Sequence, residues 1–325
     1  MNITMKRRIW VVGTLITVSL ILFAFTNLGS PTRSRLTIAT TTSIVDAGLL
    51  EYLKPHFDAR FGADMTWLYL GSGQAFAVAS RGDADILLVH DRVREDAFLA
   101  AGNGSHRITV MYNDFVIIGP TTDTARVRGA RDVLEAFKKI ANAGELGEAR
   151  FVSRGDKSGT HVLEMKIWSA LNLEPRKERW YIEAGQGMSA TIRISSEKQA
   201  YTLSDRSTWI KLNNSLGGVL KLQILFEHDK MLLNPYGLIL LNPQKYPNVN
   251  SEQAEKFFLF MISDEGQKLI DDYRIAGEQV FYSAFGKAEA IGLPSEEEEV
   301  QFWVRRLLES GLEPPSWLKL SKGGS

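Results

Sequence analysis

The sequence contains no cysteine among its 325 residues. This absence excludes a disulfide framework, a thiolate nucleophile, a zinc ribbon and an iron–sulfur site. It also excludes anchoring through a lipidated cysteine, as in bacterial lipoproteins. An exported protein that needs no disulfide is consistent with this composition.

The chain also lacks net charge, because Lys and Arg number 38 and Asp and Glu number 38. It has no basic stripe with interleaved aromatic residues, so nucleic acid is not an expected partner. The five histidines show no metal-ligand spacing, and neither a nucleophile elbow nor a phosphate-binding loop is present. We interpret His161, next to Thr160, as a capping or packing residue. The sequence therefore predicts a protein that is not an enzyme and holds no cofactor or metal.

Residues 1–34 have the features of an export segment. Lys6, Arg7 and Arg8 precede an apolar run over residues 9–25, and a polar stretch follows. A charged start before a short apolar run is typical of a secretory signal peptide. A clean small-x-small cleavage site is missing, so a cleaved signal and an uncleaved membrane anchor both stay open. In both cases we expect a periplasmic or otherwise extracytoplasmic protein, held at the membrane if the segment stays uncleaved.

After residue 34, short apolar segments typical of strands alternate with segments of helical periodicity. This alternation predicts an α/β fold with a doubly wound, mostly parallel sheet. We expect a turn at Asn234-Pro235-Tyr236-Gly237, and one long amphipathic helix over residues 252–272.

The spacing of turns along the chain predicts two lobes, the second inserted into the first. Lobe 1 comprises residues 35–118 and 235–285, and lobe 2 comprises residues 119–234. Residues 286–325 form a C-terminal helical extension, in which four glutamates lead into an amphipathic helix. We expect this helix to pack on the protein, although docking to a partner stays an alternative.

Three turns rich in hydroxyl groups or glycine fall where a predicted strand ends and a helix begins, at residues 40–43, 71–74 and 153–160. Helix N-termini expose unpaired N–H groups and carry partial positive charge, so they attract anions. Serine and threonine add neutral donors, and Arg154 adds a permanently charged one. Ligands of open α/β sheets bind at the strand ends where these turns lie. Together the turns indicate anion binding without identifying the anion.

Several longer strings in the chain are distinctive. They include Phe151-Val152-Ser153-Arg154-Gly155-Asp156, Ser158-Gly159-Thr160-His161, and the stretches at residues 40–43, 85–91, 111–117, 180–188, 201–206 and 234–237. Together they resemble the tungstate-binding proteins of tungstate ABC importers, over about residues 36–285. This resemblance implies a two-lobed type II periplasmic-binding-protein fold with an anion site in the interlobe cleft. It also implies an oxyanion ligand, tungstate or molybdate, and a partner, the ABC permease in the membrane. We expect a monomer.

The resemblance also implies which residues bind the anion. Carried over by motif, the ligand donors are Thr41, Thr42, Ser43 and Ser72 of lobe 1, and Arg154, Ser158, Gly159 and Thr160 of lobe 2. Four positions depart from the family pattern: Ser72 replaces a threonine, Lys157 an acidic residue, and Ser189 and Ser207 glycines. The hydroxyl of Ser72 preserves a donor, whereas Lys157 adds positive charge beside the site.

The identity of the cargo depends partly on Asp156. Phosphate keeps a proton at neutral pH and needs an acceptor, whereas tungstate, molybdate and sulfate suit a site made of donors. If Asp156 faced the cleft, it would favour phosphate as the ligand. We expect Asp156 instead to cap the following helix or to hold Arg154. The residues alone do not separate tungstate from molybdate, and the resemblance favours tungstate. A membrane-tethered oxyanion sensor and a phosphate- or sulfate-binding protein of the same fold stay as alternatives.

Overall fold

The computed structural model describes residues 33–318. The predicted export segment therefore lies almost wholly outside the described residues. Within residues 33–318, no helix is both long enough and apolar enough to cross a membrane.

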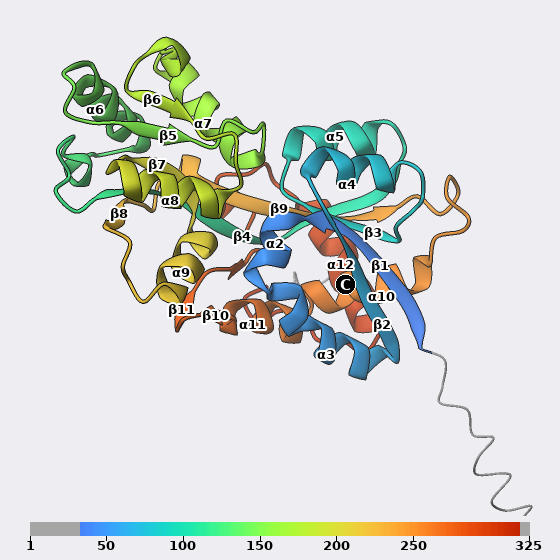
Figure 1. The fold of residues 1–325 in the computed structure, drawn as a ribbon. Helices are drawn as coiled ribbons and strands as arrows, with labels where there is room; N and C mark the ends of the chain where they lie inside the picture. Colours follow the sequence, from blue (N-terminus) through green and yellow to red (C-terminus); the bar gives the residue numbers. More distant parts are fainter. Residues whose placement is uncertain (1–32, 319–325) are drawn as a thin grey trace, which may run out of the picture.

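Lobe 1 is built on a mixed sheet with the strand order β2, β1, β3, β9, β4, β12 (Figure 1). Strands β1, β2 and β3 are parallel, whereas β9 runs antiparallel to both β3 and β4. The expected mostly parallel sheet is therefore correct only for its first three strands. The strands are β1 (Ser34–Thr41), β2 (Ala63–Leu70), β3 (Ile86–Val89), β4 (Gly104–Pro120), β9 (Leu233–Leu241) and β12 (Tyr282–Ser283).

Helices cover both faces of this sheet, as α/β folds require (Figure 1). On one face α4 and α5 pack over a small cluster that includes Leu87 and Ile239. The larger core lies on the other face, beneath α3 and α10, and includes Phe57 and Phe257. The helices are α2 (Thr42–Ala47), α3 (Leu49–Phe61), α4 (Ser72–Ala79), α5 (Arg92–Ala100), α10 (Ser251–Ile262), α11 (Asp264–Asp272) and α12 (Glu297–Glu309).

Lobe 2 has its own core, in which Phe137, Phe151 and Trp168 pack against one another. Strands β7 and β8 pair with the second half of β4, and β5 pairs in parallel with β6. The elements are α6 (Val133–Glu145), β5 (Phe151–Ser153), α7 (Gly159–Ala170), β6 (Tyr181–Glu183), α8 (Met188–Lys198), β7 (Thr202–Asp205), α9 (Arg206–Ser215) and β8 (Leu222–Phe226). The expected α/β architecture with two lobes is confirmed.

Strand β4 carries the chain from one lobe into the other. As far as Asp114 it pairs with β9, and from Phe115 onward it pairs with β7. Here Arg206, at the start of α9, donates from Nε and Nη2 to the two carboxylate oxygens of Asp114 at 2.7 and 2.6 Å. The lobe boundaries at residues 118 and 235 stay a prediction, because β4 and β9 run through them without a break.

Two local predictions are wrong. Residues 234–237 do not form a turn but belong to β9, where Gly237 allows a close approach: a Cβ there would lie 2.3 Å from the Glu95 carboxylate. The helix expected over residues 252–272 is interrupted at Ser263, whose hydroxyl accepts from the backbone N–H of Gly266 and caps α11. Amphipathic periodicity continues across this break and therefore does not reveal it.

The C-terminal extension packs against lobe 1 through α12. Val300, Trp303, Val304 and Leu307 are buried in the larger core, and the Trp303 ring lies 4.2 Å from that of Phe258. The expectation of a packed terminal helix is therefore confirmed.

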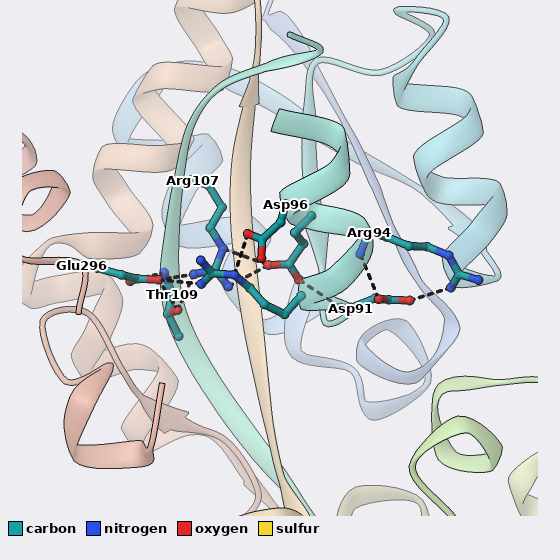
Figure 2. A network of polar contacts seen from close by, with 8 residues as sticks. Asp91, Arg94, Asp96, Arg107, Thr109 and Glu296 are labelled. Carbon is teal, nitrogen blue, oxygen red and sulfur yellow. Dashed lines mark hydrogen bonds and ion pairs between the residues drawn. The ribbon is translucent and has the colours of Figure 1, made fainter. Parts of the chain in front are cut away.

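A buried polar network fixes the start of this extension to the sheet (Figure 2). Arg107 on β4 donates from Nε to Glu95 at 2.8 Å and forms an ion pair with Glu296, which directly precedes α12. Glu296 also accepts from the backbone N–H of Thr109 at 2.9 Å and from its hydroxyl at 2.8 Å. Burial raises the pKa of Glu95, and the charge of Arg107 opposes this rise. Glu296 supplies Arg107 with a second carboxylate partner besides Glu95.

Replacing Glu296 with alanine is expected to lower the free energy of unfolding by about 3 kcal/mol, because the buried Arg107 loses one of its two carboxylate partners and the backbone N–H of Thr109 loses its acceptor. The measurement is urea unfolding followed by tryptophan fluorescence. Glu298→Ala is the matched control, since Glu298 belongs to the same acidic run and is exposed. Equal stability of the two variants would contradict a stabilising role of the network.

Candidate anion-binding site

A cleft of about 710 Å³ lies between the two lobes. The start of α2 contributes Thr42 and Ser43 from lobe 1, and Arg154 enters from the loop between β5 and α7. The remaining lobe 2 lining comes from the start of α8 and from one side of α9 along its length. The cleft therefore brings together helix N-termini from both lobes, as expected for an anion site.

In lobe 1, the hydroxyl groups after β1 form a connected set. Thr41 is buried at the end of β1, with its Oγ1 3.2 Å from Oγ of Ser43. Ser43 Oγ also lies 3.2 Å from Oη of Tyr236 and 3.4 Å from Nε2 of His90. Thr42 and Ser43 line the cleft, whereas Thr41 lies behind them.

In lobe 2, Asp156 holds Arg154 in place. Oδ2 of Asp156 accepts from Nε and Nη2 of Arg154 at 3.1 and 2.5 Å, and Oδ1 accepts from the backbone N–H of Ser158 at 3.1 Å. Burial raises the pKa of Asp156, but the hydrogen bonds from Ser158 and the charge of Arg154 outweigh it and bring the pKa below its usual value. Of the two expected roles of Asp156, holding Arg154 is confirmed, whereas the cap of α7 is Ser158.

The loop that carries Arg154 needs an unusual backbone. Gly155 has a φ of +63°, and a Cβ there would lie 2.9 Å from Cβ of Glu183. Glycine is therefore required both by the left-handed conformation and by the close approach.

The predicted donors at the start of α7 lie beside the cleft rather than among its lining residues. Ser158 caps the helix, because its hydroxyl accepts from the backbone N–H of His161, and Thr160 is buried. Gly159 lies against His90 of lobe 1, and a Cβ at this position would be 3.1 Å from the imidazole Cε1. The N-terminus of α7 therefore meets lobe 1 next to Ser43.

Two other sequence features lie away from this cleft lining. Ser72 is the first residue of α4, and Lys157 is exposed with a φ of +60°. His161 is buried, and its Nδ1 accepts from the backbone N–H of Lys157 at 2.9 Å. The interpretation of His161 as a packing residue is confirmed.

Sequence reasoning missed a large part of the lobe 2 wall, formed by the first turn of α8 and by α9. The lining residues from these two helices and the residues just before them are Gly187, Met188, Ser189, Ala190, Asp205, Ser207, Thr208, Lys211, Leu212 and Ser215. Gly187 before a helix is the same type of signal as the three turns that were recognised. Ser189 and Ser207 were noted only as departures from a pattern, yet both reach the cleft.

The carboxylates of the cleft already accept hydrogen bonds from the protein. Asp46 accepts from the hydroxyl of Tyr69 at 2.9 Å. Asp205 receives the hydroxyl of Ser207 at 2.7 Å and the backbone N–H of Thr208 at 2.8 Å, both on Oδ1. Lys211 adds a positive charge and donates to the backbone carbonyl of Asp46. The lining thus combines two cations with two carboxylates whose charge is partly offset by these donors.

Comparison with known proteins identifies the family. Residues 26–265 match the PBP superfamily domain. The tungstate-binding protein TupA of Peptoclostridium acidaminophilum is 40% identical over 238 residues, which cover 73% of this chain and 80% of the relative. The chain belongs to the TupA family within the PBP superfamily.

Solved structures agree with this assignment. The tungstate-binding protein TupA of Desulfovibrio alaskensis G20 is 44% identical, with a TM-score of 0.71, over 77% of this chain and 98% of that one. The tungstate ABC transporter protein of Geobacter sulfurreducens is 42% identical, with a TM-score of 0.64, over 74% and 98%. The resemblance seen in the sequence is confirmed. Helix α12 lies outside the family match at residues 26–265.

This TupA family member has a buried acid, Glu164, on the helix that begins beside the cleft. The carboxylate accepts from the hydroxyl of Tyr181 at 2.6 Å and from Nε1 of Trp168 at 3.1 Å. Burial raises the pKa of Glu164 to about 7, although hydrogen bonds from Tyr181, Ser153 and Trp168 oppose the rise. The folded protein therefore binds this proton more tightly than the unfolded chain does.

A raised carboxyl pKa favours folding below about pH 4.5, and this contribution is lost as pH rises through about 7. Glu164→Gln should remove the loss, so its unfolding free energy relative to the wild type should rise by about 2–3 kcal/mol from pH 5 to pH 8. Denaturant unfolding at a series of pH values measures this difference. Glu178→Gln, at an exposed site of the same lobe, should show no such trend. A pH-independent difference for Glu164→Gln would contradict the raised pKa.

Proposed function

We propose that this protein is the extracytoplasmic substrate-binding component of an ABC importer, and that it captures tungstate between its lobes and delivers it to the permease. The observation that carries the proposal is the convergence of Arg154 with hydroxyl-bearing helix N-termini on one interlobe cleft. The names of the relatives support tungstate as the cargo. Molybdate, which has nearly the same size and charge, is included in the proposed ligand class.

The state of Arg154 supports binding of a full dianion. Nε and Nη2 are held by Asp156, while Nη1 makes no hydrogen bond among the described residues. A guanidinium held in this way keeps a donor available without having to be ordered when the ligand arrives. The lowered pKa of Asp156 keeps its carboxylate ionised at neutral pH, so the clamp persists there.

Phosphate is the main competitor. Hydrogen phosphate needs an acceptor for its proton, and Oδ2 of Asp205 accepts no hydrogen bond among the described residues. An ionised acceptor facing a dianion that carries no proton is repulsive, so the position of Asp205 favours phosphate while the donors favour tungstate. The anions must therefore be compared directly.

The proposed ligand donors are the eight residues inferred from the sequence, with those in the lining, Thr42, Ser43 and Arg154, in direct contact. Thr41 and the N-terminus of α7, which do not line the cleft, would support these donors from behind once the lobes close around the anion. We also propose export through the N-terminal segment, a monomeric state, and capture without catalysis. A buried imidazole that already accepts a backbone N–H, as in His161, is unsuited to act as a base.

The first test is calorimetric titration of residues 35–325 with tungstate, molybdate, sulfate and phosphate in parallel. Tight binding of tungstate, with sulfate and phosphate much weaker, is the expected result. A preference for phosphate would reject the proposed cargo and turn attention to Asp205. Absence of binding for all four anions would reject the proposed function.

Arg154→Ala is expected to weaken tungstate binding about 10- to 100-fold, because a charge-assisted hydrogen bond contributes roughly 1.5–3 kcal/mol. The same titration measures this loss. Arg179→Ala is the control, since Arg179 is an exposed arginine of the same lobe outside the cleft lining. Equal affinities of the two variants would rule out the proposed role of Arg154.

A further inference from the structure

A polar cluster lies behind Ser43 that the predicted donor set does not include. Tyr236 on β9 is fully buried, and its Oη lies 3.2 Å from Oγ of Ser43. Asn113 on β4 and Asn234 on β9 face each other in the strand register and are also buried. Nδ2 of Asn234 donates to Oδ1 of Asn113 at 2.7 Å.

One buried hydrogen-bond donor of this cluster has no partner among the described residues. Oδ1 of Asn113 is occupied by Asn234, and Nδ2 of Asn113 is a buried donor without an acceptor within bonding distance among the described residues. Burial raises the pKa of Tyr236, and the hydrogen-bonding groups of Ser43, Asn113 and Asn234 beside the phenol oppose the rise. Tyr236 therefore keeps its proton at neutral pH and has to donate it to an acceptor.

A fully deprotonated oxyanion only accepts hydrogen bonds, so each hydroxyl that faces it must donate its single proton. Ser43 is directed to do so when another donor hydrogen-bonds to its lone pairs from behind. Oη of Tyr236 and Oγ1 of Thr41, each 3.2 Å from Oγ of Ser43, are placed to donate to it. His90 lies further away, at 3.4 Å, and burial lowers its pKa, so it is neutral at neutral pH.

We propose that Tyr236 donates its hydroxyl proton to Ser43, in a donor chain that runs from Tyr236 through Ser43 and commits the Ser43 hydroxyl to the bound anion. This inference rests on the proposed oxyanion-binding function. Tyr236 is then a positioning residue, which acts on the ligand through Ser43 and sets a preference for anions without a proton. Hydrogen bonds arranged head to tail in this way polarise one another, which strengthens the last donor.

The test is a double-mutant cycle between Tyr236→Phe and Ser43→Ala, with tungstate titrated calorimetrically. Tyr236→Phe alone is expected to weaken binding about 3- to 10-fold, the range of one hydrogen bond. In the Ser43→Ala background the same change is expected to have no further effect, because Tyr236 acts only through Ser43. Phosphate affinity should fall less than tungstate affinity in Tyr236→Phe, because a freed Ser43 can accept the phosphate proton.

Tyr201→Phe is the matched control. Tyr201 is also fully buried, and its hydroxyl is bonded to Asp123 and to the backbone N–H of Ala125 in lobe 2, away from the cleft lining. Its tungstate affinity should match that of the wild type. If Tyr236→Phe fails to fold, Asn113→Leu removes, at similar volume, one of the hydrogen-bonding groups beside the Tyr236 phenol, and its effect on tungstate binding should likewise vanish in the Ser43→Ala background.

The outcomes are distinguishable. Equal losses from Tyr236→Phe in both backgrounds, or no loss in the wild-type background, would overturn the donor chain while leaving oxyanion binding intact. A wild-type protein that binds none of the four anions would instead reject the function on which the chain depends.

Discussion

Strand β4 is shared by the two lobes, and its backbone hydrogen bonds determine where each lobe can lie. Buried N–H and C=O groups have to be paired, so a strand that leaves one sheet must enter another without a gap. Between Asp114 and Phe115 the partner changes from β9 to β7 with no unpaired step. If the angle between the lobes changes, the backbone of β4 and β9 must then bend, rather than a free loop. The ion pair between Asp114 and Arg206 anchors α9 at the same point.

This shared strand also explains why the cleft is lined by helix starts. Strands that end near the crossing deliver their following helices to one place, so the N-termini of α2, α8 and α9 contribute to one cleft. Each N-terminus brings unpaired N–H groups and partial positive charge. Of the two carboxylates that also reach the cleft, Asp205 caps α9 and Asp46 accepts from the hydroxyl of Tyr69. Hydrogen bonds from the protein therefore offset part of the negative charge that these carboxylates bring to the cleft.

The sequence allowed the two lobes, most elements and three of the cleft-lining residues, Thr42, Ser43 and Arg154, to be predicted, because apolar periodicity and strand-to-helix turns are local signals. Residues 234–237 were misread because proline and glycine are typical of turns, whereas Gly237 serves the close approach of Glu95 across the sheet. The lining from α8 and α9 was missed because it depends on how the lobes face each other. The pairing of Glu296 with Arg107, which lie 189 residues apart, has no local signal.

Through the neighbours Tyr236 and Gly237, strand β9 contributes both to the cleft and to the polar network at the start of the C-terminal extension. Side chains alternate along a strand, so these neighbours face opposite sides of the sheet. Tyr236 reaches Ser43 at the cleft, and Gly237 leaves room for Glu95 and Arg107. Gly237 is also paired with Thr109, whose backbone N–H donates to Glu296 at the start of the C-terminal extension. The extension, although outside the family match, therefore stabilises β4 where it pairs with β9, the strand that carries Tyr236.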